Sequence, residues 1–391
     1  MGVRILWASP LPPIRSGVSD YAVELLKELG EVAGIRVVRP PGWIQPDDWP
    51  LDDGIELVPA TTEPDAGEIT LIHVGNNPHH LWLLDRLADP VPVVVLHDLV
   101  LHHLMVEAWA SDDADGELAD KLFHAHGEAG TVLARGREFG LAGGREAFLF
   151  PARSLFVENA KGAIVHSHWA LDRLRSEFPE LASARVGLPA VDPGDVDRLA
   201  ERALLNCAED ETILMHLGFL TPEKGLSEVL AGLAAAVRTG VRARLLLVGE
   251  GQNARTVLDA AAAIGLGDHV TATGWMTHDR FLRAPAAADL GVVLRTPSAG
   301  ETSAAVIRFL ACGTPVAVGG LKQFLEWPET AAPRLTPGPS ASAELARLIA
   351  DAAEGTGWDL RRRGAREAYE AEHRPSETAR EMIEFLKTLQ F

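Results

Sequence analysis

The segment VVVLHD places two side chains that can act on a substrate directly after an apolar run. His97 and Asp98 follow Val93–Leu96, which has the continuous apolar character of a strand buried on both faces. In open parallel sheets, ligands bind beyond the carboxyl ends of the strands. A histidine there can donate a hydrogen bond to a substrate hydroxyl or exchange a proton. The alternative is structural, with Asp98 capping a helix and His97 bonded to backbone.

A second polar cluster, HVGNNPHH, occupies His73–His80 at the end of another apolar run. Histidine and asparagine in two such loops indicate a ligand rich in hydroxyl groups. These histidines are not paired with a carboxylate at a recognised metal-ligand spacing, so the sequence predicts no metal site.

Three loops that lead into predicted helices carry groups suited to an anion. Gly17 ends a proline-rich loop before a helix, where free N–H groups and the helix dipole favour negative charge. Lys224, in GFLTPEKG, begins another helix, where a bound diphosphate would compensate its unfavourable position. Thr302 and Ser303 begin a third helix and can bind phosphate oxygens. The alternatives are an ordinary turn at Gly17, a solvated lysine and N-capping by either hydroxyl.

Short β-rich runs alternate with amphipathic ones along the chain, which predicts an α/β fold with parallel sheets. We expect strands at Val3–Ala8, Ile35–Arg39, Ile69–Val74, Pro92–Leu96, Gly162–His166, Thr212–Gly218, Ala243–Gly249, Val270–Gly274, Leu290–Leu294 and Pro315–Val318. We expect helices at Val18–Leu29, His80–Leu87, Leu99–Trp109, Glu117–Phe139, Arg145–Asn159, Leu226–Arg238, Arg255–Ile264, His278–Ala287, Ser303–Cys312 and Gln323–Trp327, then a helical stretch from Ser342 to Phe391 broken at Pro375.

The pattern is interrupted once, at Gly187–Asp195, where proline and glycine predict a linker between domains. We therefore expect two Rossmann-like, doubly wound domains, 1–190 and 191–373. Such domains place the carboxyl ends of their sheets toward one cleft, where ligands should bind.

Composition excludes several classes of protein. With 391 residues and a net charge of −19, the chain lacks the positive field that draws proteins to nucleic acid. The two cysteines, Cys207 and Cys312, form no disulfide framework, and a reducing cytoplasm is the expected location. The opening MGVRILWASPLPP is too short and proline-rich for a signal sequence, and no apolar stretch reaches the about 18 residues of a membrane span. The oligomeric state is not predicted.

In their order and spacing, several motifs resemble the retaining family-4 glycosyltransferases of the GT-B fold. They are PLPPIRSGVSDYAVELL, LHD, GFLTPEKGL, LLLVGEG, VTATGWM and the Gly-Glu-Thr-Ser to CGTPV block. The resemblance covers nearly the whole chain. It implies an acceptor-side domain at 1–190, a nucleotide-sugar domain at 191–373 and a final helix, 374–391, that returns to the first domain.

The resemblance also implies roles for individual residues. The substrates are a UDP- or GDP-linked sugar and an unidentified acceptor, with no resident cofactor and no required metal. Lys224 holds the donor diphosphate and His97, beside Asp98, meets the transferred sugar. Trp275 and Met276 lie beside the base. The family usually has an arginine where this chain has Phe219, so one cation for the phosphates is missing.

The glutamate pair of the family is also altered. Counting back from CGTPV, the second glutamate is Arg308 here, and the first falls on Gly300 with Glu301 one place on. We expect Glu301 to reach the sugar hydroxyls. Arg308 has no acceptor for a ribose hydroxyl, so it binds phosphate, pairs with an acid or lies on a solvated face.

Two other classes of function stay open. A sugar-nucleotide epimerase of the same fold would bind the donor without an acceptor, and a non-catalytic subunit would support an active partner. A dehydrogenase is disfavoured because no Gly-x-Gly-x-x-Gly follows the first strand of either half.

Overall fold

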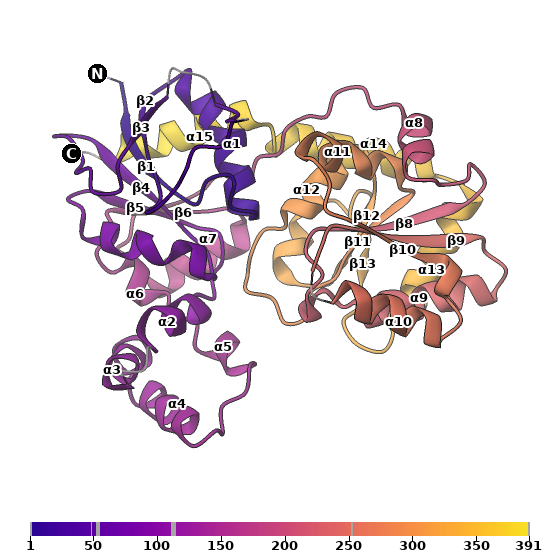
Figure 1. Ribbon diagram of the computed structural model, residues 1–391, viewed down its shortest axis with the longest axis horizontal. Helices are drawn as coiled ribbons and strands as arrows, with labels where there is room; N and C mark the ends of the chain where they lie inside the picture. Colours follow the sequence, from indigo (N-terminus) through magenta and orange to yellow (C-terminus); the bar gives the residue numbers. More distant parts are fainter. Residues whose placement is uncertain (1, 48, 52–54, 111–114, 252, 390–391) are drawn as a thin grey trace. The chain divides into compact units, whose positions relative to one another are not determined.

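The chain forms two compact α/β units (Figure 1). The computed structural model describes every residue except 1, 48, 52–54, 111–114, 252 and 390–391. Unit 1 comprises Met1–Pro189, Pro297–Thr302 and Pro375–Phe391, and unit 2 comprises Ala190–Thr296 and Ser303–Arg374. The short segment Pro297–Thr302 therefore groups with unit 1, although it lies within the sequence range that we assigned to the second domain.

Within the described residues, the sheet of unit 1 has seven parallel strands in the order β3-β2-β1-β4-β5-β6-β7. The strands are β1 (Arg4–Ala8), β2 (Gly34–Val38), β3 (Glu56–Val58), β4 (Ile69–Val74), β5 (Pro92–Leu96), β6 (Gly162–Val165) and β7 (Ser183–Arg185). The chain builds outward from β1 to β3, then returns to the other side of β1 with β4. This reversal makes the boundary between β1 and β4 the topological switch point of unit 1.

The sheet of unit 2 follows the same plan. Its described strands, all parallel, run in the order β10-β9-β8-β11-β12-β13, with the switch point between β8 and β11. They are β8 (Thr212–Leu217), β9 (Ala243–Val248), β10 (Val270–Gly274), β11 (Leu290–Val293), β12 (Val316–Gly319) and β13 (Arg334–Leu335). The expectation of two doubly wound Rossmann-like sheets is confirmed.

Helices cover the sheets of both units. Unit 1 has α1 (Gly17–Gly30), η1 (Pro78–Ala88), α2 (His102–Trp109), α3 (Asp115–His126), α4 (Glu128–Glu138), α5 (Glu146–Leu149), α6 (Ser154–Val157), α7 (His168–Glu177) and α15 (Pro375–Thr388). Unit 2 has α8 (Arg198–Leu204), η2 (Pro222–Lys224), α9 (Leu226–Arg238), α10 (Ala254–Ala263), η3 (Gly267–His269), α11 (His278–Arg283), η4 (Ala284–Ala287), α12 (Ala304–Ala311), η5 (Lys322–Glu326), α13 (Ala341–Glu354) and α14 (Trp358–Glu372). Helix α15 packs beside α1, and the backbone N–H of Gly187 donates to Glu381 on α15.

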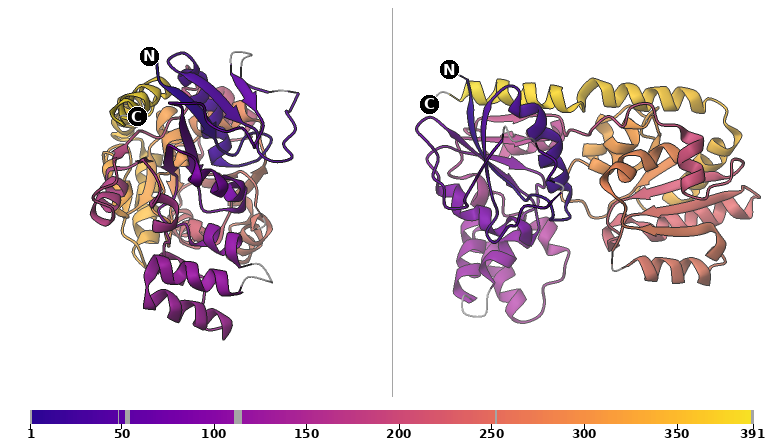
Figure 2. Two further views of the ribbon diagram at one scale, coloured as in Figure 1. Left: turned by 90° about the vertical axis from the view of Figure 1, so that its left-hand side faces the viewer. Right: turned by 45° about the horizontal axis from the view of Figure 1, so that its top comes forward.

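Three of the predicted helices are wrong as single elements, and the one expected at 278–287 is divided into α11 and the 3₁₀ turn η4. The helix expected at 117–139 is instead the pair α3 and α4, which lie side by side in unit 1 (Figure 2). Gly127 separates them with a positive φ of 60°, and a Cβ on Gly130 would lie 1.9 Å from the carbonyl oxygen of Leu122. The helix expected at 145–159 is split into α5 and α6 because Pro151 cannot continue a helix.

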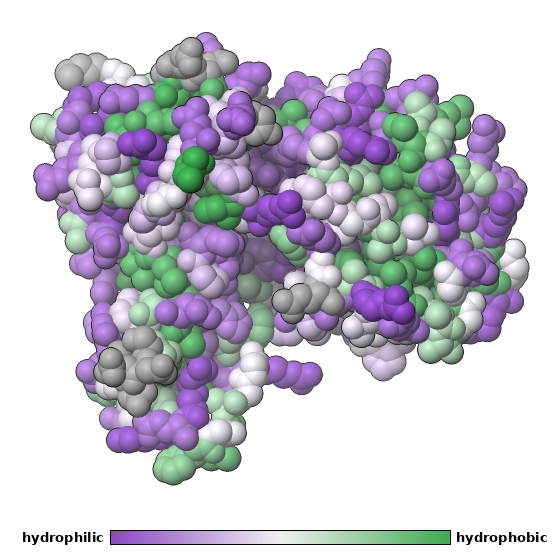
Figure 3. Space-filling model, viewed as in Figure 1, coloured by the Kyte–Doolittle hydropathy of each residue, from purple (hydrophilic) through white to green (hydrophobic). Residues whose placement is uncertain are grey.

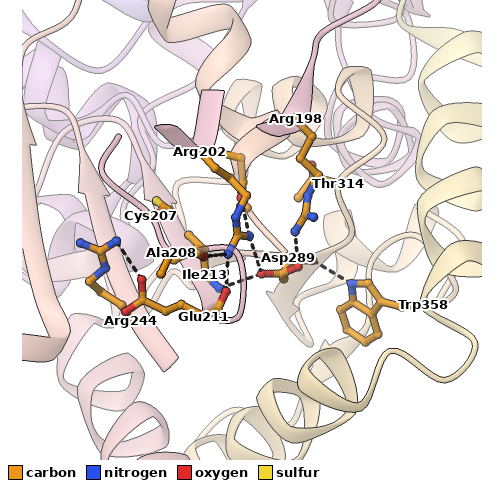
Figure 4. A network of polar contacts seen from close by, with 12 residues as sticks. Arg198, Arg202, Cys207, Ala208, Glu211, Ile213, Arg244, Asp289, Thr314 and Trp358 are labelled. Atoms are coloured by element: carbon orange, nitrogen blue, oxygen red, sulfur yellow. Dashed lines mark hydrogen bonds and ion pairs between the residues drawn. The ribbon is translucent and has the colours of Figure 1, made fainter. Parts of the chain in front are cut away.

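A buried ionic network ties the start of unit 2 to its sheet (Figure 4). Asp289, just before β11, accepts hydrogen bonds from the backbone N–H of Ile213 at 2.8 Å and from Arg202 at 3.2 Å, and it pairs with Arg198. The indole N–H of Trp358 on α14 donates to the carbonyl oxygen of Asp289 at 2.9 Å. Asp289 thus joins α8, β8, β11 and α14 through its carboxylate and its backbone carbonyl, which is a structural role.

On the face drawn in Figure 3, hydrophilic side chains dominate on both units and apolar ones are scattered among them. None of the described helices is long and apolar enough to cross a membrane.

Candidate functional site

In each unit, the predicted ligand-binding residues gather at the carboxyl edge of the sheet. In unit 1, Gly17 follows β1 and His97 follows β5, on strands that flank the switch point or lie next to it. In unit 2, Lys224 follows β8 and Ser303 follows β11, the two strands of its switch point. Because ligands of doubly wound sheets bind at such points, the topology supports a site in each unit.

An aromatic and histidine cluster fills the carboxyl edge of unit 1. Its members come from neighbouring strands and from α1: Trp7, Tyr21, His73, His97 and His166. The ring centroids of Trp7 and His73 are 3.9 Å apart, and the ring of Tyr21 meets that of His97 edge-on at 4.8 Å. The ring nitrogens Nδ1 of His73 and Nε2 of His97 are 3.1 Å apart and share a hydrogen bond. His97 is partly exposed, whereas His73 is fully buried.

This environment keeps the histidines uncharged. Burial, reinforced by the nearby His166 and His73, holds the pKa of His97 well below its usual range. Burial has the same effect on the pKa of His73 and lowers the pKa of His80 to about 4. Neutral imidazole carries one donor and one acceptor nitrogen, so His97 is equipped to orient a hydroxyl group rather than to carry charge.

Asp98 and Asn76 brace the loops around this cluster. One carboxylate oxygen of Asp98 accepts a hydrogen bond from the backbone N–H of Asn76 at 2.9 Å. The side-chain oxygen of Asn76 in turn accepts from the backbone N–H groups of His103 and Leu104, at 2.9 and 3.1 Å, in the first turn of α2. This contact of Asp98 holds the loop after β4 and is not the helix cap of the structural alternative.

Glu301 belongs to unit 1 together with His97. The carbonyl oxygen of Ala299 accepts hydrogen bonds from the backbone N–H groups of Leu99 and Val100, at 2.8 and 3.0 Å, just beyond His97. Gly300 has a φ of +79°, and a Cβ there would lie 2.9 Å from Trp169. Only glycine suits this position. The carboxylate of the buried Glu301 accepts a hydrogen bond from the Ser298 hydroxyl at 3.0 Å.

Gly17 is not required by the packing of the chain. Its φ is not positive, it is exposed, and a Cβ added there would meet no atom within 4 Å. The helix that it starts is capped by Ser16, whose hydroxyl accepts from the backbone N–H of Ser19 at 3.1 Å. Gly17 is thus an exposed residue beside a side-chain cap, and its place in an anion or sugar site stays a prediction.

Lys224 lies in a tight turn at the switch point of unit 2. It ends the 3₁₀ turn η2 and is only 8% exposed, so it is not the solvated lysine of the structural alternative. Its charge acts on His216 in β8, whose pKa is lowered to about 3 by burial first and by Lys224 second. Arg295, two residues after β11, lowers the same pKa. The N–H of Thr296 donates to the carbonyl oxygen of Glu223 at 2.9 Å. Two cations thus lie in the loops that follow the two strands of the switch point.

The loops after β8 and β9 approach each other closely. Gly249 has a φ of +133°, and a Cβ there would lie 2.3 Å from the carbonyl oxygen of Gly218. Phe219, the residue that replaces the family arginine, is exposed beside this contact. The glycine of the LLLVGEG motif therefore lets the loops after β8 and β9 approach closely, at the edge of the sheet where Lys224 lies.

Helix α12, the first helix after β11, begins after Ser303 without a side-chain cap. Ser303 occupies the N-cap position of α12, but its side chain makes no capping hydrogen bond. The capping alternative is therefore not realised at Ser303. Arg308 on the same helix is 4% exposed, and its guanidinium lies 5.6 Å above the ring of Phe281. The solvated alternative for Arg308 is wrong, because an apolar helix buries that position.

The remaining predicted residues are Trp275 and Met276 in unit 2 and Thr302 in unit 1. Trp275 and Met276 follow β10, with Trp275 half exposed and Met276 partly buried. Thr302 is partly buried and ends the segment that groups with unit 1. Within the described ranges, no three His, Cys, Asp or Glu side chains are placed to hold a metal ion.

Sequence reasoning missed Tyr21 on α1, Arg295, and the pairing of His73 with His97. The pairing had a signal, since β4 and β5 are adjacent and both end in histidine-containing loops. Arg295 had the same signal, because it directly follows a predicted strand.

Comparison with known proteins identifies the fold. Residues 211–354 match the family model described as glycosyl transferases group 1. Over 99% of both chains, the structure resembles the sucrose-phosphate synthase of Thermosynechococcus elongatus, with a TM-score of 0.69 and 18% sequence identity. The chain therefore has the GT-B fold of such glycosyltransferases.

Two curated relatives share part of the sequence. The D-inositol 3-phosphate glycosyltransferase of Segniliparus rotundus is 35% identical over 144 residues, which cover 34% of this chain and 31% of that protein. The GDP-mannose-dependent alpha-(1-6)-phosphatidylinositol monomannoside mannosyltransferase of Mycobacterium tuberculosis is 28% identical over 331 residues, covering 81% of this chain and 80% of that protein. The chain thus spans about a third of the first relative and four fifths of the second.

Proposed function

We propose that this chain, which has the GT-B fold and matches the glycosyl transferases group 1 over residues 211–354, moves a sugar from a nucleotide-diphosphate donor to an acceptor. The observation that carries the proposal is the buried Lys224 at the switch point of unit 2, inside the matched region. Ligands of doubly wound sheets bind at the switch point, and an ammonium group held there suits the oxygens of a diphosphate.

In this proposal, unit 2 binds the donor. Lys224 and Arg295 contact the diphosphate, and Arg295 takes the place of the arginine that Phe219 replaces. The Ser303 hydroxyl and the first N–H groups of α12 bind phosphate oxygens. Trp275 and Met276 lie beside the base. Arg308 supports the site through its contact with Phe281 rather than through the ribose.

Unit 1 supplies the acceptor side and the groups that meet the transferred sugar. His97 orients a sugar hydroxyl, Glu301 reaches others, and Asp98 holds the loop in place. With retention of configuration, the leaving phosphate would take the acceptor proton, so His97 need not be a strong base. The low pKa of His97 is consistent with this role. Gly17 leaves room for the ligand at the first turn of α1.

We propose a polyol ring as the acceptor class. The two relatives are named for acting on D-inositol 3-phosphate and on phosphatidylinositol monomannoside, and the latter is named as GDP-mannose-dependent. Inositol compounds with GDP- or UDP-sugars are therefore the first pairs to test.

We also propose a cytoplasmic location, with which the buried, free thiol of Cys207 is consistent.

The test is a transfer assay with the purified chain, with products identified by mass and anomeric configuration by NMR. A glycosylated acceptor whose anomeric configuration matches the donor supports the proposal, and an inverted product refutes retention. His97→Ala should lower turnover far more than donor affinity. Conversion of the donor sugar without an acceptor would favour an epimerase. Absence of binding to every nucleotide sugar would favour a non-catalytic subunit.

A further inference from the structure

We propose that His73 is a positioning residue, which fixes the tautomer of His97 so that His97 presents an Nδ1–H donor to a hydroxyl oxygen of the bound sugar. The hydrogen bond of 3.1 Å between Nδ1 of His73 and Nε2 of His97 carries the inference. The direction of the donor at His97 is a property of the chain alone. Only the identity of its ligand rests on the proposed function.

The neighbouring histidines have defined tautomers. Nδ1 of His80 lies 2.8 Å from the carbonyl oxygen of His73, and Nδ1 of His166 lies 3.0 Å from that of Val186. A carbonyl oxygen only accepts, so both nitrogens carry the proton. When these rings are neutral, their Nε2 atoms carry no proton and have no N–H to offer to the His73–His97 pair.

Two arrangements are left for the pair. If His97 donated from Nε2, neutral His73 would carry its proton on Nε2. That atom is buried and has no hydrogen-bond partner among the described residues, so an N–H donor would be stranded. If His73 instead donates from Nδ1, its buried Nε2 carries no proton, and only an acceptor lone pair is left without a partner. Stranded buried N–H groups are the rarer of the two in proteins, which selects the second arrangement.

The second arrangement decides what His97 offers to a ligand. Its Nε2 accepts from His73, so the single proton of the neutral ring is on Nδ1. Within the described part of the chain, Nδ1 of His97 has no hydrogen-bond partner, and the side chain is partly exposed. His97 therefore donates to an oxygen at this edge. It does not accept a hydroxyl proton there, which separates an orienting role from that of a general base.

The geometry is held by packing around His73. Its ring lies 3.9 Å from that of Trp7 and 5.3 Å from that of Tyr21, and none of the three side chains is more than slightly exposed. The ring therefore has little room to turn. Phenylalanine would preserve this stacking while removing Nδ1, which makes His73→Phe the informative variant.

The experiment reads ring nitrogens by NMR on the full chain labelled with ¹⁵N-histidine, with His97→Gln to assign the signals. We expect Nδ1 of His97 to be of the protonated, pyrrole type and Nε2 of the pyridine type. His73→Phe should shift His97 toward the Nε2–H tautomer, and His73→Leu is the second variant if the first does not fold. His102→Phe is the matched control. His102 is also a buried histidine, but its ring bonds to the carbonyl oxygen of Phe150 and not to His97.

A protonated Nε2 on His97 in the unmodified chain overturns the proposal, as does an unchanged His97 spectrum in His73→Phe. Both readings are made without substrate, so they stand even if no transfer is found. With an active donor pair, His73→Phe should lower kcat about fivefold, the loss of one neutral hydrogen bond. The affinity for the nucleotide without its sugar should not change, and a matching loss there would point to a merely structural role.

Discussion

Lowering the pH from 7.5 to 5 should destabilise unit 2 through His216, a buried side chain near the carboxyl end of β8. His216 is 1% exposed, and burial together with the charge of Lys224 lowers its pKa to about 3. In the unfolded chain the pKa returns to about 6.5. The two states therefore bind protons differently across this range of pH.

The sign follows from which state takes the proton. Below about pH 6.5 the unfolded chain protonates His216 while the native unit keeps it neutral, so stability falls as the pH falls and levels off near the native pKa. With pKa values of about 3 and about 6.5, the loss between pH 7.5 and pH 5 is about 2 kcal/mol.

The assay is denaturant-dependent hydrogen exchange of peptides from β8, which reports unfolding of unit 2 separately from unit 1. The His216→Leu variant should lose about 2 kcal/mol less than the parent chain over the same pH interval. Any constant effect of the substitution cancels, because each variant is compared with itself at two pH values. His80→Leu is the control, since His80 is a buried histidine of unit 1 with a pKa of about 4. An equal loss in His216→Leu and in the parent chain would refute the reasoning.

Two further substitutions probe the structure. Asp289→Asn should lower the free energy of unfolding of unit 2 by about 3 kcal/mol, because it leaves buried arginines uncompensated. Asp210→Asn is the control, because the pair of Asp210 with Arg242 is exposed and its loss should cost less than about 1 kcal/mol. Urea unfolding measures both variants, and equal losses would contradict the structural role of Asp289. Gly300→Ala should raise amide exchange at Leu99 and Val100, since the added Cβ strains the segment that binds them. Unaltered exchange would show that this attachment does not depend on the glycine.

The sheets could be predicted well because apolar runs mark buried parallel strands. Each of the ten predicted strands overlaps an observed one. The strands that were missed, β3, β7 and β13, have two or three residues each and no continuous apolar run. Short edge strands depend on pairing with a neighbour, which a single sequence does not display.

The sites were less predictable because long-range contacts decide them. Glu301 lies far from His97 in the sequence, and its membership of unit 1 depends on the hydrogen bonds between Ala299 and the loop after β5. The burial of Arg308 likewise depends on Phe281, which belongs to another helix. The loop residues at strand ends could be found from pattern alone, since topology brings those ends to one edge.

The measurement that tests the central claim most directly is calorimetric titration of UDP and of GDP into the parent chain and the Lys224→Ala variant. We predict that one of the nucleotides binds and that Lys224→Ala weakens it about 10- to 100-fold, as for a lost charge-assisted hydrogen bond. Arg238→Ala is the control, because Arg238 lies at the opposite end of α9. Failure of both nucleotides to bind, or an equal affinity in Lys224→Ala, would contradict a donor site at the switch point of unit 2.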